Sequence, residues 1–191
     1  MRILVACERS GVVRDAFIKR GHDAVSCDLV ASEVDGPHVI GDALDLARSE
    51  RWDMMIAFPP CTHLSVSGAR YFAEKRADGR QQAALQFVRD LMDAPIPRIA
   101  IENPVGIIST QIRRPDQIIQ PWQFGEDASK KTCLWLKNMP PLMATGILVK
   151  QRYANQTPSG QNKLGPSATR AMERGRTYQG IAEAMASQWG G

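Results

Sequence analysis

Short apolar runs alternate with amphipathic helical patterns along most of the chain, and this alternation constrains the fold more than any other feature. The runs that predict strands cover residues 2–6, 22–27, 39–40, 53–57, 98–101, 132–136 and 146–149. Helical patterns cover residues 11–19, 44–49, 80–92 and 181–189, with Ser10 as the expected cap of the first helix. This alternation is typical of an α/β fold with a mostly parallel sheet and helices on both faces. The strands at 132–136 and 146–149 are expected to be antiparallel edge strands joined by a Pro140-Pro141 turn.

Two stretches interrupt this alternation. Residues 58–78 begin with Pro59 and Pro60 and are predicted to be a long loop at the carboxyl end of the fourth strand. Residues 150–177 are polar, basic and rich in Gly, Ser and Asn, which predicts a second loop. In open α/β sheets, binding sites form at the carboxyl ends of the strands. We therefore expect the first loop to carry functional residues.

The length of 191 residues is enough for one compact domain but not for two ordinary ones. Hydrophobic residues make up 43% and charged residues 23% of the chain, as in globular proteins. No apolar run approaches the roughly 20 residues of a membrane span, and the first run is shorter than the roughly 7 to 15 residues of a signal-peptide core. We expect a single cytoplasmic domain, residues 1–191, that does not contact a membrane.

The cysteine pattern bears on metal and disulfide chemistry. The four cysteines, Cys7, Cys27, Cys61 and Cys133, are widely spaced, and no two of them form a CxxC pair. Such spacing argues against a disulfide framework and against a structural zinc site. We therefore expect reduced thiols and no bound metal.

Basic residues gather towards the C-terminal end. The chain has 24 Lys and Arg against 20 Asp and Glu, a net charge of +4. Residues 128–191 hold nine basic and two acidic residues, so this part carries +7 and the remainder −3. A basic surface gains affinity for an anionic polymer through counterion release, but a solvated face that only keeps the protein soluble has the same composition. Charge alone leaves both interpretations open.

Polar residues that can carry chemistry directly follow two apolar strands. Cys61 comes after the fourth predicted strand, and Glu102 and Asn103 come after the fifth. Taken singly, a cysteine in a proline turn is usually a small buried residue, and a carboxylate is usually a surface charge. A thiol and a carboxylate at the same ends of neighbouring strands would face one cleft, which favours a catalytic site.

These motifs resemble those of the DNA cytosine carbon-5 methyltransferases. Pro59-Pro60-Cys61 is similar to the Pro-Cys motif of that family, and Glu102-Asn103-Pro104-Val105 is similar to its Glu-Asn-Val motif. The resemblance implies a Rossmann-like class I methyltransferase sheet, S-adenosylmethionine as cofactor and cytosine in DNA as substrate. The chain resembles in particular small phage-encoded proteins of this type, so the resemblance implies a bacterial host cell.

Further matches occur in the family's order. Ser10-Gly11 stands at the glycine-rich cofactor turn, with one glycine in place of several, while Asp28 and Gly41-Asp42 end the second and third strands. Phe124-Gly125 followed by Lys130-Lys131-Thr132 resembles a segment with a Phe-Gly turn and basic residues before a strand. The likeness covers most of residues 1–136.

The resemblance implies a covalent mechanism. Cys61 would add as thiolate to carbon 6 of cytosine, and Glu102 would hydrogen-bond or protonate ring nitrogen 3, a role suited to a buried carboxyl with a raised pKa. Asn103 would hold the loop, and Lys131 would contact the base or a phosphate. The target base must be flipped out of the duplex or lie in single-stranded DNA.

The resemblance also implies binding residues. Those expected to contact S-adenosylmethionine are Cys7, Glu8, Ser10, Gly11, Asp28, Leu29, Asp42 and Pro59, with Asp28 on the ribose and Asp42 on the adenine amino group. Those expected to contact DNA are Ser65, Lys130, Lys163, Arg170, Arg174 and Arg176. Residues 137–178 form a short basic segment in place of the family's target-recognition domain. This implies little sequence specificity, or a partner protein or second copy of the chain that supplies it.

Three functions therefore remain open. The first is methylation of cytosine carbon 5 in DNA. The second keeps the fold and Cys61 but acts on RNA or a free nucleotide, or uses a modified S-adenosylmethionine that donates another group. The third is a nucleic-acid-binding protein with an inactive site, which would not be stabilised by S-adenosylmethionine.

Overall fold

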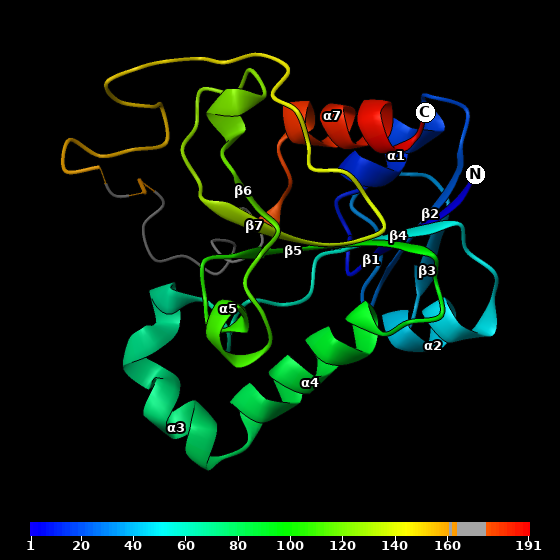
Figure 1. Cartoon of the computed structure of the whole chain (residues 1–191), viewed down its shortest axis with the longest axis horizontal. Coiled ribbons are helices and arrows are strands. Elements are labelled where there is room, and N and C mark those ends of the chain that lie inside the picture. The colour runs from blue at the N-terminus through cyan, green and yellow to red at the C-terminus, as the bar shows by residue number, and fades with distance from the viewer. Residues whose placement is uncertain (161, 164–174) are drawn as a thin grey trace.

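A mixed seven-stranded sheet forms the centre of the computed structural model, which describes residues 1–160, 162–163 and 175–191 (Figure 1). The strands are β1 (Arg2–Ala6), β2 (Asp23–Asp28), β3 (His38–Ile40), β4 (Met54–Ala57), β5 (Arg98–Pro104), β6 (Gln117–Ile119) and β7 (Thr132–Lys137). The helices are α1 (Val12–Ile18), α2 (Ala43–Ser49), α3 (Phe72–Ala77), α4 (Arg80–Met92), α5 (Ile108–Gln111) and α7 (Gln179–Trp189). Two 3₁₀ turns, η1 (Val66–Tyr71) and η2 (Pro121–Gln123), complete the described elements.

The strand order is β3-β2-β1-β4-β5-β7-β6. All neighbouring pairs are parallel except those of β7, which runs antiparallel to both β5 and β6. The prediction of a Rossmann-like, mostly parallel sheet with an antiparallel element is therefore confirmed. The order reverses at β1, since the chain continues to β2 on one side of it and later returns to β4 on the other. Ligands bind at such a switch point in open α/β sheets.

Two hydrophobic clusters cover the two faces of the sheet. Alternate residues of β1 point to opposite faces of the sheet. Ile3 and Val5 belong to the cluster that includes α1 and α7, whereas Leu4 and Ala6 belong to the cluster that includes α2 and α4. Figure 1 shows these helix pairs on opposite sides of the sheet. Burial on both faces explains the continuous apolar run of β1. In the described part of the chain, no helix is long and apolar enough to span a membrane.

The predicted strand at 146–149 is wrong. These residues form only an isolated bridge between Gly146 and Phe124, and the Leu148 N–H donates to the carbonyl of Trp122. The partner of β7 at the sheet edge is β6 instead, a strand too short to produce a visible alternation in the sequence.

The prediction of an unbroken loop over residues 58–78 is also wrong, because η1 and α3 lie within it. The helix α3 lacks the apolar stripe that makes a helix recognisable in a sequence, and its one buried residue is Lys75. In Figure 1, α3 and the start of α4 extend away from the sheet.

Candidate active site

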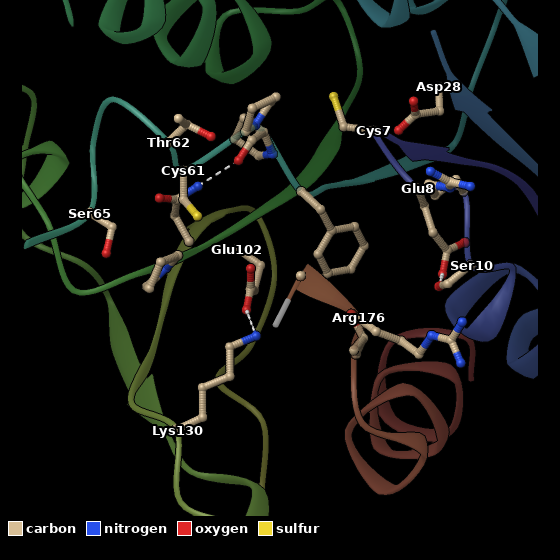
Figure 2. Close-up of a pocket in the computed structure, with 18 of the residues that line it drawn as sticks. Cys7, Glu8, Ser10, Asp28, Cys61, Thr62, Ser65, Glu102, Lys130 and Arg176 are labelled. Carbon is tan, nitrogen blue, oxygen red and sulfur yellow. Dashed lines mark hydrogen bonds and ion pairs between the residues drawn. The ribbon is translucent and has the colours of Figure 1, made fainter. Parts of the chain in front are cut away.

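A cavity of about 560 Å³ lies at the carboxyl ends of β1, β2, β4 and β5, next to the switch point (Figure 2). Its wall includes eleven of the predicted site residues, namely Cys7, Glu8, Ser10, Asp28, Pro59, Cys61, Ser65, Glu102, Asn103, Lys130 and Arg176. Figure 2 shows Cys61 and Glu102 at one end of the cavity and Cys7, Asp28 and Ser10 at the other. The cavity thus has two chemically different ends.

Parallel pairing of β4 with β5 brings Cys61 and Glu102 to the same cavity. Ala57, the last residue of β4, is in register with Ile101, and β5 continues beyond this point to Pro104. Glu102 is the first β5 residue beyond the end of β4, and the strand therefore extends past the predicted end at residue 101, whereas Pro59 and Pro60 carry the chain after β4 to Cys61. The side chains that the sequence predicts on neighbouring strand ends therefore face one space.

Hydrogen bonds tie the Cys61 loop to the loop after β5. The Asn103 amide, which is 1% exposed, donates from Nδ2 to the carbonyl of Pro59 at 2.7 Å. The Ile107 N–H donates to the carbonyl of Leu64 at 2.9 Å. A Cβ at Gly106 would lie 2.2 Å from that carbonyl oxygen, so only glycine permits this close approach. These contacts fix the two candidate catalytic loops relative to one another.

Asn103 also presents an unsatisfied oxygen. Its Oδ1 is buried and has no hydrogen-bond partner among the described residues. A buried polar atom without a partner is costly, and a ligand that supplies an N–H or O–H donor relieves that cost. Since Asn103 lines the cavity, this oxygen suits a polar ligand at the Cys61 end.

Glu102 lies in a largely desolvated position. Its side chain is 13% exposed, and burial raises the pKa of its carboxyl above the ordinary value. The Lys130 ammonium, with Nζ 3.9 Å from Glu102 Oε1, and a hydrogen bond from Thr132 lower the pKa and oppose this effect in part. The raised pKa favours the protonated carboxyl, which can donate a proton.

The three cysteines other than Cys61 are weak candidates for the nucleophile. Burial, followed by the charge of Asp28, raises the pKa of Cys7 to about 12, and the same causes raise the pKa of Cys27 to about 11. Burial also raises the pKa of Cys133. These three are thiols at neutral pH and therefore poor nucleophiles. Cys61 is half-buried in the cavity wall.

At the other end, Glu8 caps α1. Its carboxylate accepts hydrogen bonds from the Val13 and Arg14 N–H groups, at 2.8 and 3.2 Å, and from the Ser10 hydroxyl at 3.1 Å. The predicted cap was Ser10, which is wrong because the N-cap residue is Gly11 and the capping carboxylate comes from further upstream. Burial raises the pKa of Glu8, although these hydrogen bonds favour its ionised form.

Several predicted residues lie away from the cavity wall. Leu29 is 74% exposed, a Cβ at Gly11 would collide with the Arg14 guanidinium, and Asp42 caps α2 by accepting from the Leu44 N–H at 2.7 Å. Lys131, the predicted contact of the base or a phosphate, is exposed, and the lysine that lies beside Glu102 is Lys130. Lys163 is exposed at the surface, whereas Arg170 and Arg174 lie outside the described residues.

An ion-pair cluster that the sequence did not predict lies in the cavity wall. Glu33, from the loop after β2, pairs with Arg9 at 3.1 Å and with Arg176 just before α7. The fully buried Arg14 holds that loop, since its guanidinium donates to the carbonyl of Asp35 at 2.8 Å. No spacing in the sequence indicates these contacts, because they join three distant segments.

Comparisons with known proteins show similarity to methyltransferase structures only at low identity. No family model and no curated protein matches the chain. Among solved structures, a prophage-encoded E. coli protein named as a DNA modification methyltransferase is 14% identical, with a TM-score of 0.47 over 71% of this chain and 46% of that one. The 16S rRNA methylase RmtB is 16% identical, with a TM-score of 0.37 over 71% of this chain and 55% of that one.

The chain thus spans about half the length of both of these structures. Similarities this weak carry no argument about substrate or activity. Function has to be inferred from the cavity itself.

Proposed function

We propose that this protein transfers a methyl group from S-adenosylmethionine to carbon 5 of cytosine in DNA. The observation that carries this proposal is that Cys61 and Glu102 line one cavity from the ends of two adjacent parallel strands. A thiol nucleophile beside a carboxyl of raised pKa is the pair that addition to a cytosine ring requires.

The residues present at the Asp28 end fit the cofactor. The cavity volume lies within the range of about 300–1,000 Å³ that small-molecule sites occupy. Asp28 ends β2 and lines the cavity, the position from which a carboxylate binds ribose hydroxyls in nucleotide-binding sheets. When bound, S-adenosylmethionine would supply an electrophilic methyl group. The carboxylate of Glu8 is engaged with α1 and contributes to the wall rather than offering a free charge.

The Cys61 end suits activation of the base. The Cys61 thiolate adds to carbon 6 and forms a C–S bond, while Glu102 donates its proton or a hydrogen bond to nitrogen 3, so that electron density moves to carbon 5. Carbon 5 would then take the methyl group, with S-adenosylhomocysteine as the leaving group. Solvent takes the carbon 5 proton, the C–S bond breaks so that Cys61 leaves as thiolate, and any proton given to nitrogen 3 returns to Glu102. The ring of a stacked, paired cytosine is inaccessible to such a site, so the target cytosine must be flipped out of the duplex or lie in a single strand.

A covalent trapping experiment tests this mechanism. The substrate is an oligonucleotide in which the target base is 5-fluorocytosine. Fluorine replaces the carbon 5 proton and cannot be removed by a base, so the covalent adduct with Cys61 should persist in the presence of S-adenosylmethionine. We expect a protein–DNA adduct with the wild type and with Cys7→Ser, and none with Cys61→Ser. An adduct with Cys61→Ser would refute the assignment. An adduct that forms with the corresponding RNA oligonucleotide but not with DNA would show that the substrate is RNA.

A further inference from the structure

A lysine side chain is buried beneath the loop that carries Cys61. Lys75, on α3, is 7% exposed, and its Nζ donates to the carbonyl of Thr62 at 2.6 Å. Thr62 directly follows Cys61. Lysine is almost never buried unless an acidic group pairs with it, because an ammonium loses much hydration energy in the interior.

Among the described residues, no ion pair joins Lys75 to a carboxylate. The acidic side chains on either side of it in the sequence, Glu74 and Asp78, both pair with Arg80 at the surface. The contacts of the Lys75 ammonium are instead neutral: the Thr62 carbonyl and the Tyr71 ring, whose centroid is 5.9 Å away. Within the described part of the chain, the buried ammonium thus has neutral partners and no carboxylate.

The Cys61 loop curves around this ammonium. A Cβ at Gly68 would lie 3.3 Å from Lys75 Nζ and 3.6 Å from the Thr62 carbonyl oxygen, so a glycine leaves the space that the ammonium fills. Ser67 and Gly68 also line the cavity. The positive charge thus lies under the same short stretch of chain that presents Cys61.

Other charged groups act on this end of the cavity from different elements. Glu102 and Lys130 also line this end of the cavity and form an ion pair with each other, and His63 lies in the same loop as Cys61. Because Lys130 faces Glu102, its charge is shared with a carboxyl. Lys75 is the buried cation on the loop side, in a region where weak solvent screening strengthens its effect.

We infer that Lys75 is a positioning residue that holds the Cys61 loop through the Thr62 carbonyl and favours the thiolate form of Cys61 through its buried charge. This role rests on the proposed function of Cys61 as nucleophile. A positive charge close to a thiol stabilises the thiolate, and only the thiolate is nucleophilic. The proton released from Cys61 passes to solvent.

The pH dependence of Cys61 alkylation tests this inference. The rate at which iodoacetamide forms a carbamidomethyl thioether on Cys61, with release of iodide, would be followed by peptide mass spectrometry in the full chain. Lys75→Met removes both charge and hydrogen bond, Lys75→Gln keeps a hydrogen-bond donor, and Lys75→Arg keeps the charge. Arg76→Met removes an exposed charge from the same helix and is the matched control.

We expect the midpoint of the alkylation profile to rise by about one pH unit in Lys75→Gln and Lys75→Met and to stay at the wild-type value in Arg76→Met. Lys75→Arg should keep most of the wild-type profile, and it remains informative if the neutral variants fail to fold. A wild-type midpoint in Lys75→Gln would overturn the inference and leave only a hydrogen-bonding role. The assay uses neither cofactor nor DNA, so it can succeed even if trapping of Cys61 on DNA fails.

Discussion

Lys130 Nζ lies 3.9 Å from Glu102 Oε1, inside the cavity that also contains Cys61. Burial and the lysine act on the carboxyl in opposite directions: burial raises the pKa of Glu102, and the lysine lowers it. The balance between them determines the pH range in which Glu102 can act as an acid.

Replacement of Lys130 by methionine should extend activity towards alkaline pH. Without the ammonium, the pKa of Glu102 rises further, so the protonated carboxyl persists to higher pH. The measurement is the rate of methyl transfer as a function of pH, with the exposed Lys131→Met as control. A shift of the alkaline limb to lower pH would contradict the assigned pairing.

Replacement of Glu102 by glutamine should separate stability from activity. Because the folded-state pKa of Glu102 is raised, its stabilising contribution is present at low pH and is lost as the pH rises through that pKa. Glu102→Gln should therefore unfold at a higher temperature than the wild type at alkaline pH but not at acidic pH. Its activity should fall by about 10²–10⁴-fold. Equal melting curves at all pH values would indicate that the carboxyl is not desolvated.

Asp28 and Asp42 should respond differently to alanine substitution. Asp28→Ala removes a cavity carboxylate and should weaken binding of S-adenosylmethionine, as measured by calorimetry. Asp42→Ala removes the cap of α2 and should lower the free energy of unfolding by about 0.5–2 kcal/mol with little change in affinity. Loss of affinity in Asp42→Ala alone would restore its predicted contact with adenine.

Gly106→Ala should uncouple the two loops of the candidate site. The added Cβ would overlap the Leu64 carbonyl, which forces the chain apart and should cost about 1–3 kcal/mol of stability together with activity. Gly41→Ala is a suitable control, because its Cβ would meet only a Val39 side-chain atom at 3.9 Å. If both variants behave alike in denaturant unfolding, the close approach at Gly106 is unimportant.

Asn155 should help to position Lys130 through the backbone of the preceding residue, Ser129. Its side-chain amide accepts from the Ser129 N–H and donates to the Ser129 carbonyl, both at 2.9 Å. Asn155→Ala should therefore reduce activity and shift its pH profile in the same direction as Lys130→Met. Gln156→Ala removes two side-chain hydrogen bonds within the same loop, with the Tyr153 N–H and the Gly160 carbonyl, without touching Ser129 and should leave the profile unchanged.

The strands and helices with strong patterns could be predicted from the sequence. Burial on both faces makes β1 and β4 continuous apolar runs, and the predicted helix at 80–92 coincides with α4. The three-residue strand β6 and the exposed helix α3 escaped prediction because neither carries a periodic hydrophobic signal.

The candidate site shows the same division. Cys61 and Glu102 could be predicted to meet because Cys61 comes after β4 and Glu102 lies just past the point where the parallel strand β5 stops pairing with β4. The choice between Lys130 and Lys131 depends on how the chain enters β7, and the pairing of Glu33 with Arg9 and Arg176 depends on loops that meet only in the folded protein. The buried position of Lys75 likewise has no signature in a sequence where charged residues normally indicate a surface.

Mass spectrometry of nucleosides from a host that lacks cytosine methylation tests the central claim most directly. The host would express the wild type or Cys61→Ser, and its DNA would be digested completely. The account predicts 5-methylcytosine with the wild type and none with Cys61→Ser. Equal amounts of 5-methylcytosine from both proteins, or unmodified cytosine alone from both, would contradict it.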